Sequence, residues 1–414
     1  MALQVVGAKS IASAELSLVA EQLWPGLGGG DLRVSAGASS DPSWVTIEQH
    51  ALGLWRGDVA MVLPRHRRVA TRALRQYRNL RSGKRQLERW AWGRAIATGH
   101  HALWGTITLE ARRGSAAAQT TTPVQELVRG LGQQEAHFAM SVRRTANRKA
   151  LLQVVDATGA TVGFAKLGRN SVSSRGVRRE SQALGRLQGG NFRLKTPSIL
   201  CQGEVNGHPY ILIEPLPPDI YRIEKVKSGG PTTDELAAIA PVHRHAVPAE
   251  TFHFKSLVKR AAALDGVASV REGLSALNIL LHSVGTESRL MPVAAYWHGD
   301  FAYWNTGRTA TGQMWCWDFE NGEDDALLGL DVLHWYASKV REQHGATGLA
   351  HWLRQAELED LRKCGLDACH QRILRKVYGA EIIARTLEMA SLDGWSAVWA
   401  GQSRVLEIAR SVAG

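Results

Sequence analysis

The sequence predicts an α+β protein built from a β-rich part followed by a helical part. Three observations predict it. Strand-like segments dominate residues 135–213, helix-like segments dominate the chain after residue 230, and the proline-broken stretch "EPLPP" (214–218) joins the two. Alternating apolar residues between turn signals are typical of strands, whereas apolar residues three and four apart are typical of helices. Such segregation favours a two-lobed α+β design.

The length and composition limit the classes of protein to which the chain can belong. A chain of 414 residues is long enough for two or three compact units, and 44% hydrophobic with 21% charged residues is an ordinary globular balance. No segment has the roughly 18 consecutive apolar residues of a membrane helix, and the first ten residues do not resemble a signal peptide. The four cysteines show no disulfide framework, which favours a cytoplasmic protein.

The first 120 residues are predicted to form an accessory region of unknown role. A helix is expected over 13–24, strands over 43–64 and 102–113, and a linker over the small, polar residues 114–122. We therefore place a boundary near residue 120, with a β-rich lobe over 121–216 and a helical lobe over 217–414.

Arginines are concentrated in residues 65–94, which contain a single acid, Glu88. The net charge of the chain is +12, and much of the excess lies here. Arg68, Arg72, Arg75 and Arg78 recur at helical spacing. Two interpretations stay open: a solvated helix face, or a surface that contacts anionic lipid, glycan or nucleic acid. No specific nucleic-acid motif accompanies the segment.

Each element of the β-rich lobe has its own local signal. Thr122, Pro123 and Gln125 form the pattern of a capping box at a helix start. A strand over 137–144 and a hairpin over 149–168, which turns at Asp-Ala-Thr-Gly, follow. A helix over 173–188 precedes two strands that meet at an Asn-Gly turn.

Lys166 and Glu180 are the first candidates for chemistry. Lys166 ends the apolar strand "VGFAKLG", and Glu180 lies on the next predicted helix. A carboxylate that fixes a buried lysine lets the ammonium group reach phosphate oxygens as a point charge. This pair favours a phosphate-binding role over an exposed strand-end lysine.

Asp300, Asn305 and Asp318 are the second group of candidates. Asp300 and Asn305 lie in "HGDFAYWN", directly after an apolar run, and Asp318 ends "MWCWD". Carboxylate and amide oxygens on neighbouring loops suit Mg²⁺. Asp300 can then orient a hydroxyl and accept its proton, which is the division of labour that phosphoryl transfer needs.

In this order the residues resemble the aminoglycoside phosphotransferase family, a branch of the protein-kinase-like fold, over about residues 130–410. The resemblance implies that Asp300 is the catalytic base, that Asn305 and Asp318 hold Mg²⁺, and that Lys166 binds the phosphates of ATP or GTP. It also implies that Asp331 bonds to the catalytic loop. The segment 211–217 would meet the base of the nucleotide through its backbone; its contact residues are Ile213, Glu214 and Leu216.

Two segments bear on this resemblance in different ways. Residues 235–248 resemble the family's helix that ends in a histidine turn. The loop 142–150, expected to cover phosphates, departs from the family pattern because it has no glycine, so Arg143, Arg144 or Asn147 are its candidate contacts.

Other polar clusters keep two interpretations each. Glu323, Asp324 and Asp325 either attract a cationic substrate or form a solvated acidic loop. Tyr303 and Trp304 either belong to the core or stack on a sugar ring. Two groups do not make convincing metal sites: His243, His245 and His253, and the pair Cys364 and Cys369.

The function that these residues predict is Mg²⁺-dependent transfer of the terminal phosphate of ATP or GTP to a hydroxyl of a small molecule or a glycan. Two alternatives belong to other classes. One is a nucleotide-binding pseudokinase, and the other is an adaptor that acts through the basic N-terminal region.

Overall fold

The computed structural model describes residues 4–6, 13–37, 40–55, 58–76, 83–98, 105–132, 136–143, 150–188, 194–222, 231–237, 241–395 and 401–413. They belong to two compact units. The β-rich unit comprises residues 1–144, 148–181 and 197–216, and the helical unit comprises residues 182–196 and 217–414. The predicted α+β class, with strands and helices segregated in this way, is confirmed.

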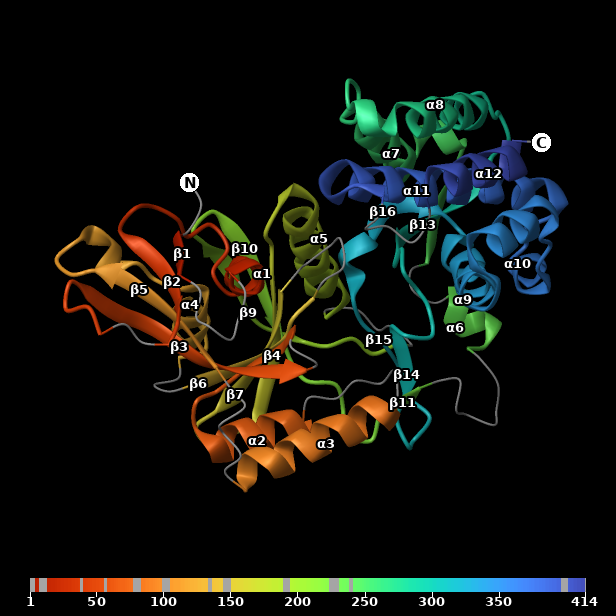
Figure 1. Cartoon of the computed structure of the whole chain (residues 1–414). Coiled ribbons are helices and arrows are strands. Elements are labelled where there is room, and N and C mark those ends of the chain that lie inside the picture. The colour runs from red at the N-terminus through yellow and green to blue at the C-terminus, as the bar shows by residue number, and fades with distance from the viewer. Residues whose placement is uncertain are drawn as a thin grey trace. The chain divides into compact units, whose positions relative to one another are not determined.

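A ten-stranded sheet forms the frame of the described part of the β-rich unit (Figure 1). Its strand order is β1-β2-β5-β3-β4-β6-β7-β8-β10-β9. The strands are β1 (Gln4–Val6), β2 (Leu32–Ala36), β3 (Trp44–Trp55), β4 (Asp58–Leu63), β5 (Thr106–Arg112), β6 (Ala136–Ser141), β7 (Ala150–Asp156), β8 (Thr161–Leu167), β9 (Ile199–Val205) and β10 (His208–Ile213). The first five strands therefore share one sheet with the five that follow residue 120.

Helices cover both faces of this sheet. Side chains alternate between faces along a strand. On β6, Phe138 and Met140 pack in the cluster that contains α1 (Ser13–Leu23), whereas Ala139 between them packs in the cluster that contains α2 (Arg67–Gln76). The helix α3 (Gly83–Ala97) lies beside α2 (Figure 1). The α1 helix and the α2–α3 layer thus lie on opposite faces.

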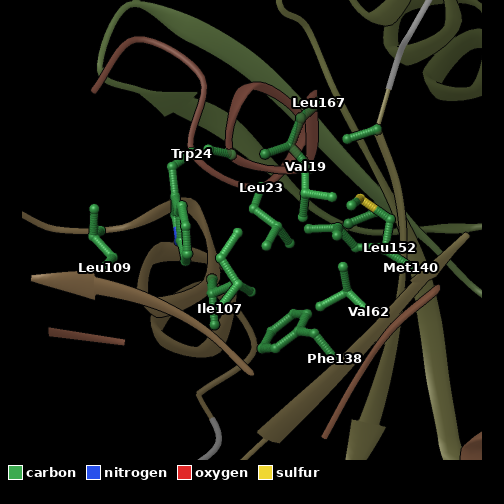
Figure 2. Packing of buried hydrophobic residues seen from close by; sticks show 14 of the residues in the cluster. Val19, Leu23, Trp24, Val62, Ile107, Leu109, Phe138, Met140, Leu152 and Leu167 are labelled. Atoms are coloured by element: carbon green, nitrogen blue, oxygen red, sulfur yellow. The ribbon is translucent and has the colours of Figure 1, made fainter. Parts of the chain in front are cut away.

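The α1 cluster draws its members from both sides of residue 120 (Figure 2). Val19 and Leu23 of α1 pack with Ile107 of β5, Leu152 of β7 and Leu167 of β8. All five side chains are at most 1% exposed. The boundary predicted near residue 120 therefore lies inside this unit.

The predicted linker folds as a short 3₁₀ helix, Ala116–Gln119, ahead of α4 (Pro123–Gly130). The capping box at the start of α4 is present. Thr122 Oγ1 accepts from the backbone N–H of Gln125 at 3.2 Å, and the Gln125 side chain accepts from the backbone N–H of Thr122 at 3.0 Å.

The other local predictions for this unit are also confirmed. Strands β7 and β8 form the expected antiparallel hairpin, and Asp156 accepts hydrogen bonds from Thr158 and Ala160 in its turn. Strands β9 and β10 meet at Asn206 and Gly207, which both have positive φ, as the Asn-Gly turn requires. Helix α5 (Ser171–Leu187) connects β8 to β9.

The helical unit contains two small sheets among its described residues. One has the order β11-β14-β15 and the other β12-β13-β16. The strands are β11 (Tyr221–Arg222), β12 (Val242–Ala246), β13 (Met291–Trp297), β14 (Thr306–Arg308), β15 (Met314–Cys316) and β16 (Glu323–Leu327). The helices are α6 (Thr233–Ala237), α7 (Phe252–Ala262), α8 (Arg271–Gly285), α9 (Leu330–Gln355), α10 (Glu359–Lys363), α11 (Ala368–Asp393) and α12 (Gln402–Ala413).

Two predictions for this unit are wrong. In the described part of the expected helix and histidine turn over 235–248, residues 235–237 belong to α6, and Val242–Ala246 forms strand β12, which pairs with β13. The solvated acidic loop, one of the two interpretations of residues 323–325, is also wrong, because these residues belong to strand β16, which pairs with the other edge of β13. In both cases the partner strand outweighs local propensity.

The described helices include none that is long and apolar enough to cross a membrane.

Candidate active site

Lys166 and Glu180 form a buried ion pair in the β-rich unit. Lys166 lies on β8, and its Nζ lies 2.6 Å from each carboxylate oxygen of Glu180 on α5. The lysine is 6% exposed and the glutamate 0%. Either charge would be very costly to bury alone, so the pair holds both side chains in one geometry. The contact predicted from their spacing is present.

Gly168 allows the start of α5 to come close to the end of β8. A Cβ at this position would lie 2.6 Å from the Oγ and 2.8 Å from the Cα of Ser174. The start of α5 is fixed further because Ser173 N donates to Asn170 Oδ1 at 2.8 Å and Asn170 N donates to Ser173 Oγ at 3.0 Å. These contacts set the helical turn on which Glu180 lies.

The predicted nucleotide-contact segment, 211–217, begins in β10 and continues beyond it. Ile213 is buried in β10, and Leu216 is half-buried after the strand. Glu214 donates its backbone N–H to Ser198 O at 2.9 Å, and its carboxylate accepts from the backbone N–H and the hydroxyl of Ser198 at 2.9 and 3.0 Å. The backbone carbonyl group of Glu214 is therefore the group left to contact the base of a nucleotide.

The first part of the loop predicted to cover phosphates is held in place at Arg143. The Gln22 side chain accepts from the backbone N–H of Arg143 and donates to its carbonyl, both at 3.0 Å. Gln22 is 1% exposed on α1, so the accessory region holds the beginning of this loop. Arg144 and Asn147, the other candidate contacts, lie outside the described residues.

In the helical unit, the loop after β13 turns at Gly299, where φ is +79°. A Cβ there would lie 2.1 Å from the carbonyl oxygen of Asn321, so no other residue fits without displacing backbone. Asp331 at the start of α9 accepts from the backbone N–H groups of His298 and Gly299 at 2.9 and 3.1 Å. These are the bonds to the loop that were expected of Asp331.

Asp300 is oriented by three donors. His334 Nε2 lies 3.0 Å from Asp300 Oδ1, while Asn305 Nδ2 donates to Oδ2 at 2.8 Å and Trp304 Nε1 donates to Oδ2 at 3.3 Å. The Tyr378 hydroxyl lies 3.1 Å from His334 Nδ1 and donates to it when Nε2 carries the proton that bonds Asp300. Tyr378 and His334 thus form a buried chain that ends on the carboxylate.

Electrostatics keep Asp300 ionised. Burial acts to raise its pKa, but the hydrogen bond from His334, the charge interaction with that residue and the positive charge of Arg341 leave the pKa below the usual value for an aspartate. Burial lowers the pKa of His334. Asp300 is therefore ionised in the resting site, and His334 bonds to one of its carboxylate oxygens.

His298 is held neutral behind the loop. The backbone N–H of Asp300 donates to His298 Nδ1 at 3.2 Å, so the opposite nitrogen, Nε2, donates to Trp317 O at 3.1 Å. Burial lowers the pKa of His298 to about 4, against the opposing pull of Asp300 and Asp318. Burial also raises the pKa of Asp331 to about 7.

Asn305 and Asp318 lie at the same end of the β14–β15 ladder. Thr306 pairs with Cys316, and the next step of the ladder is a hydrogen bond from Trp317 N to Asn305 O at 3.1 Å. Asp318 follows directly in a left-handed conformation, with φ +70° and ψ +59°. This conformation costs a non-glycine residue on the order of 1 kcal/mol or more, and such outliers cluster at functional sites.

Arg385 of α11 bonds to both loops. It donates to Gly299 O at 2.6 Å and to Asn321 O at 3.3 Å, and its guanidinium lies 5.3 Å from the ring centroid of Trp297. Its Nε also bonds to Glu381 at 2.5 Å. The arginine therefore fixes the Asp300 loop relative to the chain that follows Asp318.

Glu381 belongs to a buried network of charges. It accepts two hydrogen bonds from Arg260 at 2.8 and 2.9 Å and lies 3.1 Å from His253 Nε2, while Arg260 also bonds to Glu388 at 2.8 Å. Burial opposes ionisation of Glu381, but Arg260 and Arg385 hold its pKa well below the usual range. His253 is thus a structural side chain.

The acidic side chains of β16 are engaged within the fold. Asp325 bonds to Arg244 at 2.6 and 2.7 Å, Asp324 bonds to Arg186, and Glu323 accepts from Ser256 at 2.9 Å. These contacts weaken the interpretation in which the three acids attract a cationic substrate.

No group of three or more His, Cys, Asp and Glu side chains that could hold a metal occurs among the described residues. Cys364 is the C-cap residue of α10 and Cys369 is the second residue of α11, and both are free thiols. A site made of one amide oxygen, one carboxylate and phosphate oxygens needs no such group, and Mg²⁺ favours such oxygen donors. Asn305 directs its amide nitrogen at Asp300, which leaves its oxygen as the donor suited to a cation.

Sequence reasoning missed His334, Tyr378 and Arg385. They lie 34 or more positions beyond the residues that they support, and nothing local marks them. Only His334 carries a partial signal, because it follows Asp331 by three positions and so shares its helix face.

The sequence matches no protein-family model, and no curated protein matches it. Solved structures with distant similarity include the following three. LicA in complex with AMP has a TM-score of 0.45 and 13% identity, and the match covers 70% of this chain and 96% of that one. A putative fructosamine-3-kinase from Haemophilus somnus 129PT has a TM-score of 0.38 and 12% identity, with 70% and 95% covered.

The streptomycin–ATP complex of the aminoglycoside phosphotransferase APH(2″)-IIa has a TM-score of 0.35 and 11% identity, with 58% of this chain and 92% of that one covered. Because these identities and TM-scores are low, the chemistry of this chain has to be inferred from its own residues.

Proposed function

We propose that the protein transfers the terminal phosphate of ATP or GTP to a hydroxyl group of a small molecule or a glycan. The observation that carries the proposal is Asp300. Asp300 is ionised and directly follows Gly299, a position at which only glycine fits. Three separate side chains bond to its carboxylate and orient it. A core turn needs no such arrangement, whereas phosphoryl transfer needs a positioned hydroxyl acceptor.

In the proposed reaction the substrate oxygen bonds to the terminal phosphorus while the bond from that phosphorus to the bridging oxygen breaks. The hydroxyl proton passes to Asp300, and the nucleoside diphosphate leaves. Asp300 is already ionised in the resting site, and His334 holds the oxygen that does not accept the proton. Orientation of the hydroxyl is thus the main task of the carboxylate.

The remaining predicted residues would bind the nucleotide and its metal. Lys166, fixed by Glu180, would bind phosphate oxygens, and the backbone at Ile213, Glu214 and Leu216 would contact the base. Asn305 and Asp318 would hold Mg²⁺, which when bound neutralises phosphate charge. The oxygen-only donor set at the end of the β14–β15 ladder supports this assignment.

The test compares Asp300→Asn with the wild type. Asparagine keeps the size of the side chain but removes the proton acceptor, so we expect turnover to fall by ~10²–10⁴-fold. Affinity for Mg·ATP or Mg·GTP should change little. Transfer of labelled terminal phosphate to a library of hydroxyl compounds gives turnover, and calorimetry gives affinity.

Asp265→Asn is the matched control, because it makes the same chemical change at an exposed aspartate of the same unit. It should leave both quantities unchanged. Equal turnover in the wild type and Asp300→Asn would remove Asp300 from catalysis. Tight nucleotide binding with no transfer to any acceptor would favour the pseudokinase alternative.

A further inference from the structure

The outer layer of the β-rich unit, made of α2 and α3, has an unusual surface. The two helices lie side by side on the sheet face opposite α1 (Figure 1), and Thr71 Oγ1 of α2 lies 3.4 Å from Gly93 O of α3. Val69, Ala73 and Leu74 are buried toward the sheet. The other side of this layer faces solvent.

Helix α2 is fixed to the hairpin that carries Lys166. Gln153 Nε2 donates to Ala73 O at 3.1 Å, and Gln76 Oε1 accepts from the backbone N–H and the hydroxyl of Thr161 at 2.7 and 3.0 Å. The helix therefore cannot rotate freely about its axis. Its exposed side is a defined surface on a rigid support.

That exposed side is strongly positive. Arg65, Arg67, Arg68 and Arg75 are all exposed, and within the described residues no carboxylate forms an ion pair with any of them. Arg72 is exposed too and donates to the Thr158 hydroxyl at 2.9 Å. A solvated helix face normally interleaves charges of both signs, and this one does not.

Helix α3 adds large apolar side chains to the same layer. Leu87 is 66% exposed and Trp90 is 52% exposed. Ala91 and Arg94 are also exposed, so the four residues recur at the spacing of one helix stripe. The Arg94 guanidinium lies 5.7 Å from the centroid of the Trp90 ring. An exposed tryptophan and leucine one turn apart, beside arginines, need an apolar as well as an anionic partner.

We propose that the α2–α3 layer docks the protein on an anionic membrane surface. The arginines would bind lipid headgroups, while Trp90 and Leu87 would enter the interface between headgroups and acyl chains. Tryptophan is typical of that depth, because its ring is apolar and its N–H stays hydrated. A nucleic acid would use the arginines and stack on Trp90, but it has no use for a projecting leucine. Lipid therefore accounts for more of the surface.

The experiment measures sedimentation of the full chain with vesicles made of equal parts phosphatidylserine and phosphatidylcholine. Binding should be absent on phosphatidylcholine alone and should weaken as salt is raised, because surface charges are screened. The triple variant Arg67→Glu, Arg68→Glu and Arg75→Glu should bind on the order of 100-fold more weakly. Because these side chains are exposed, the fold should survive, and thermal unfolding checks it.

Two matched controls separate the surface from general properties. Lys255→Glu, Lys259→Glu and Arg271→Glu make the same change in net charge on exposed residues of the helical unit, and should leave binding within a few-fold. Ile279→Ser changes a side chain as exposed as Leu87, 66% in each case, and should have no effect where Leu87→Ser weakens binding.

Three results would overturn the proposal. Equal losses in the two charge-reversal triples would show that only net charge matters. Unchanged binding in Leu87→Ser and Trp90→Ser would exclude insertion of the apolar side chains. Binding to single-stranded or duplex DNA through the same arginines, with none to vesicles, would assign the surface to nucleic acid. None of these outcomes depends on phosphotransferase activity.

Discussion

The Lys166–Glu180 pair is buried and the carboxylate of Asp300 is half-buried, and the two are stabilised in different ways. The pair consists of two side chains on consecutive elements, 14 positions apart, and the ammonium group bonds to both carboxylate oxygens. Asp300 is held by a turn whose supports come from α9 and α11, 32–86 positions later in the chain. Removing either partner abolishes the local contact. Removing one of several supports of the Asp300 turn takes away only the stabilisation that this support contributes.

The largest effect is expected at the buried Lys166–Glu180 pair. Lys166→Met removes the ammonium group that lies 2.6 Å from the fully buried carboxylate of Glu180, and breaking a buried pair in this way costs about 3–5 kcal/mol. The double variant Lys166→Met, Glu180→Leu removes both charges and should regain most of that free energy of unfolding. Denaturant unfolding measures the cycle, and a double variant that loses the sum of the two single losses would contradict it.

A surface pair of the same unit is the control for this cycle. Arg178 and Glu204 are 3.1 Å apart, with side chains 53% and 54% exposed. Breaking an exposed pair costs about 1 kcal/mol or less. Arg178→Met should therefore change the free energy of unfolding far less than Lys166→Met.

The next effect tests the turn that carries Asp300. Gly299 and Gly312 both have positive φ, +79° and +86°, and both lie in the helical unit. A Cβ at Gly312 meets no atom within 4 Å, whereas one at Gly299 meets the Asn321 carbonyl. Gly312→Ala should cost about 1 kcal/mol from backbone strain alone, and Gly299→Ala about 2–5 kcal/mol, because strain and overlap add.

Gly299→Ala should also lower phosphate transfer, since the overlap moves the loop relative to its supports, while Gly312→Ala should leave transfer unchanged. Unfolding and transfer assays on the two variants check both statements. Equal losses at the two glycines would show that the close approach of Gly299 to Asn321 does not add to the cost of the substitution.

The smallest expected effect is a pH dependence of the free energy of unfolding that arises from His298 in the Asp300 loop. The folded-state pKa of His298 is about 4, below the usual value of about 6.5 for an unfolded chain. Between these values the unfolded state takes up a proton that the folded state refuses. Stability is thus fully present above pH 6.5 and is lost as pH falls toward 4.

His298→Gln removes this loss, because glutamine can accept from the Asp300 N–H and donate to Trp317 O without titrating. Relative to the wild type, the variant should gain up to about 3 kcal/mol between pH 7 and pH 4. Denaturant unfolding at several pH values measures the difference. A difference between the two proteins that does not change with pH would show that His298 is not neutral in the fold.

Sequence reasoning succeeded where a signal is local. The β7–β8 hairpin, the turn at Asn206 and Gly207, and the capping box at Thr122 each depend on a few adjacent residues. The spacing of Lys166 and Glu180 is of the same kind. Strand β12 was missed because its partner, β13, begins about 45 residues later, so that its strand character depends on a distant edge.

The same limit applies to the candidate site. Asp300, Asn305 and Asp318 have a recognisable spacing, and Trp304 and Asn305 contact Asp300 locally, but its other supports come from residues that are adjacent only after folding. His334 and Tyr378 look like ordinary helix residues in the sequence, and Arg385 like one more surface arginine. Their roles depend on the packing of α9 and α11 against the loop, and no local pattern encodes that packing.

The shared core of the β-rich unit has a consequence for the order in which the chain can fold during synthesis. The cluster that begins at Leu16 and Val19 is completed by Leu167 and, last of all, by Tyr210 and Leu212. The first 120 residues emerge from the ribosome long before those partners exist, and Gln22 must wait for Arg143. A nascent chain stalled near residue 120 would hold an unfinished core, with β4 lacking the strand that later covers its edge. The accessory region is thus made first but becomes stable only when about half of the chain has been translated.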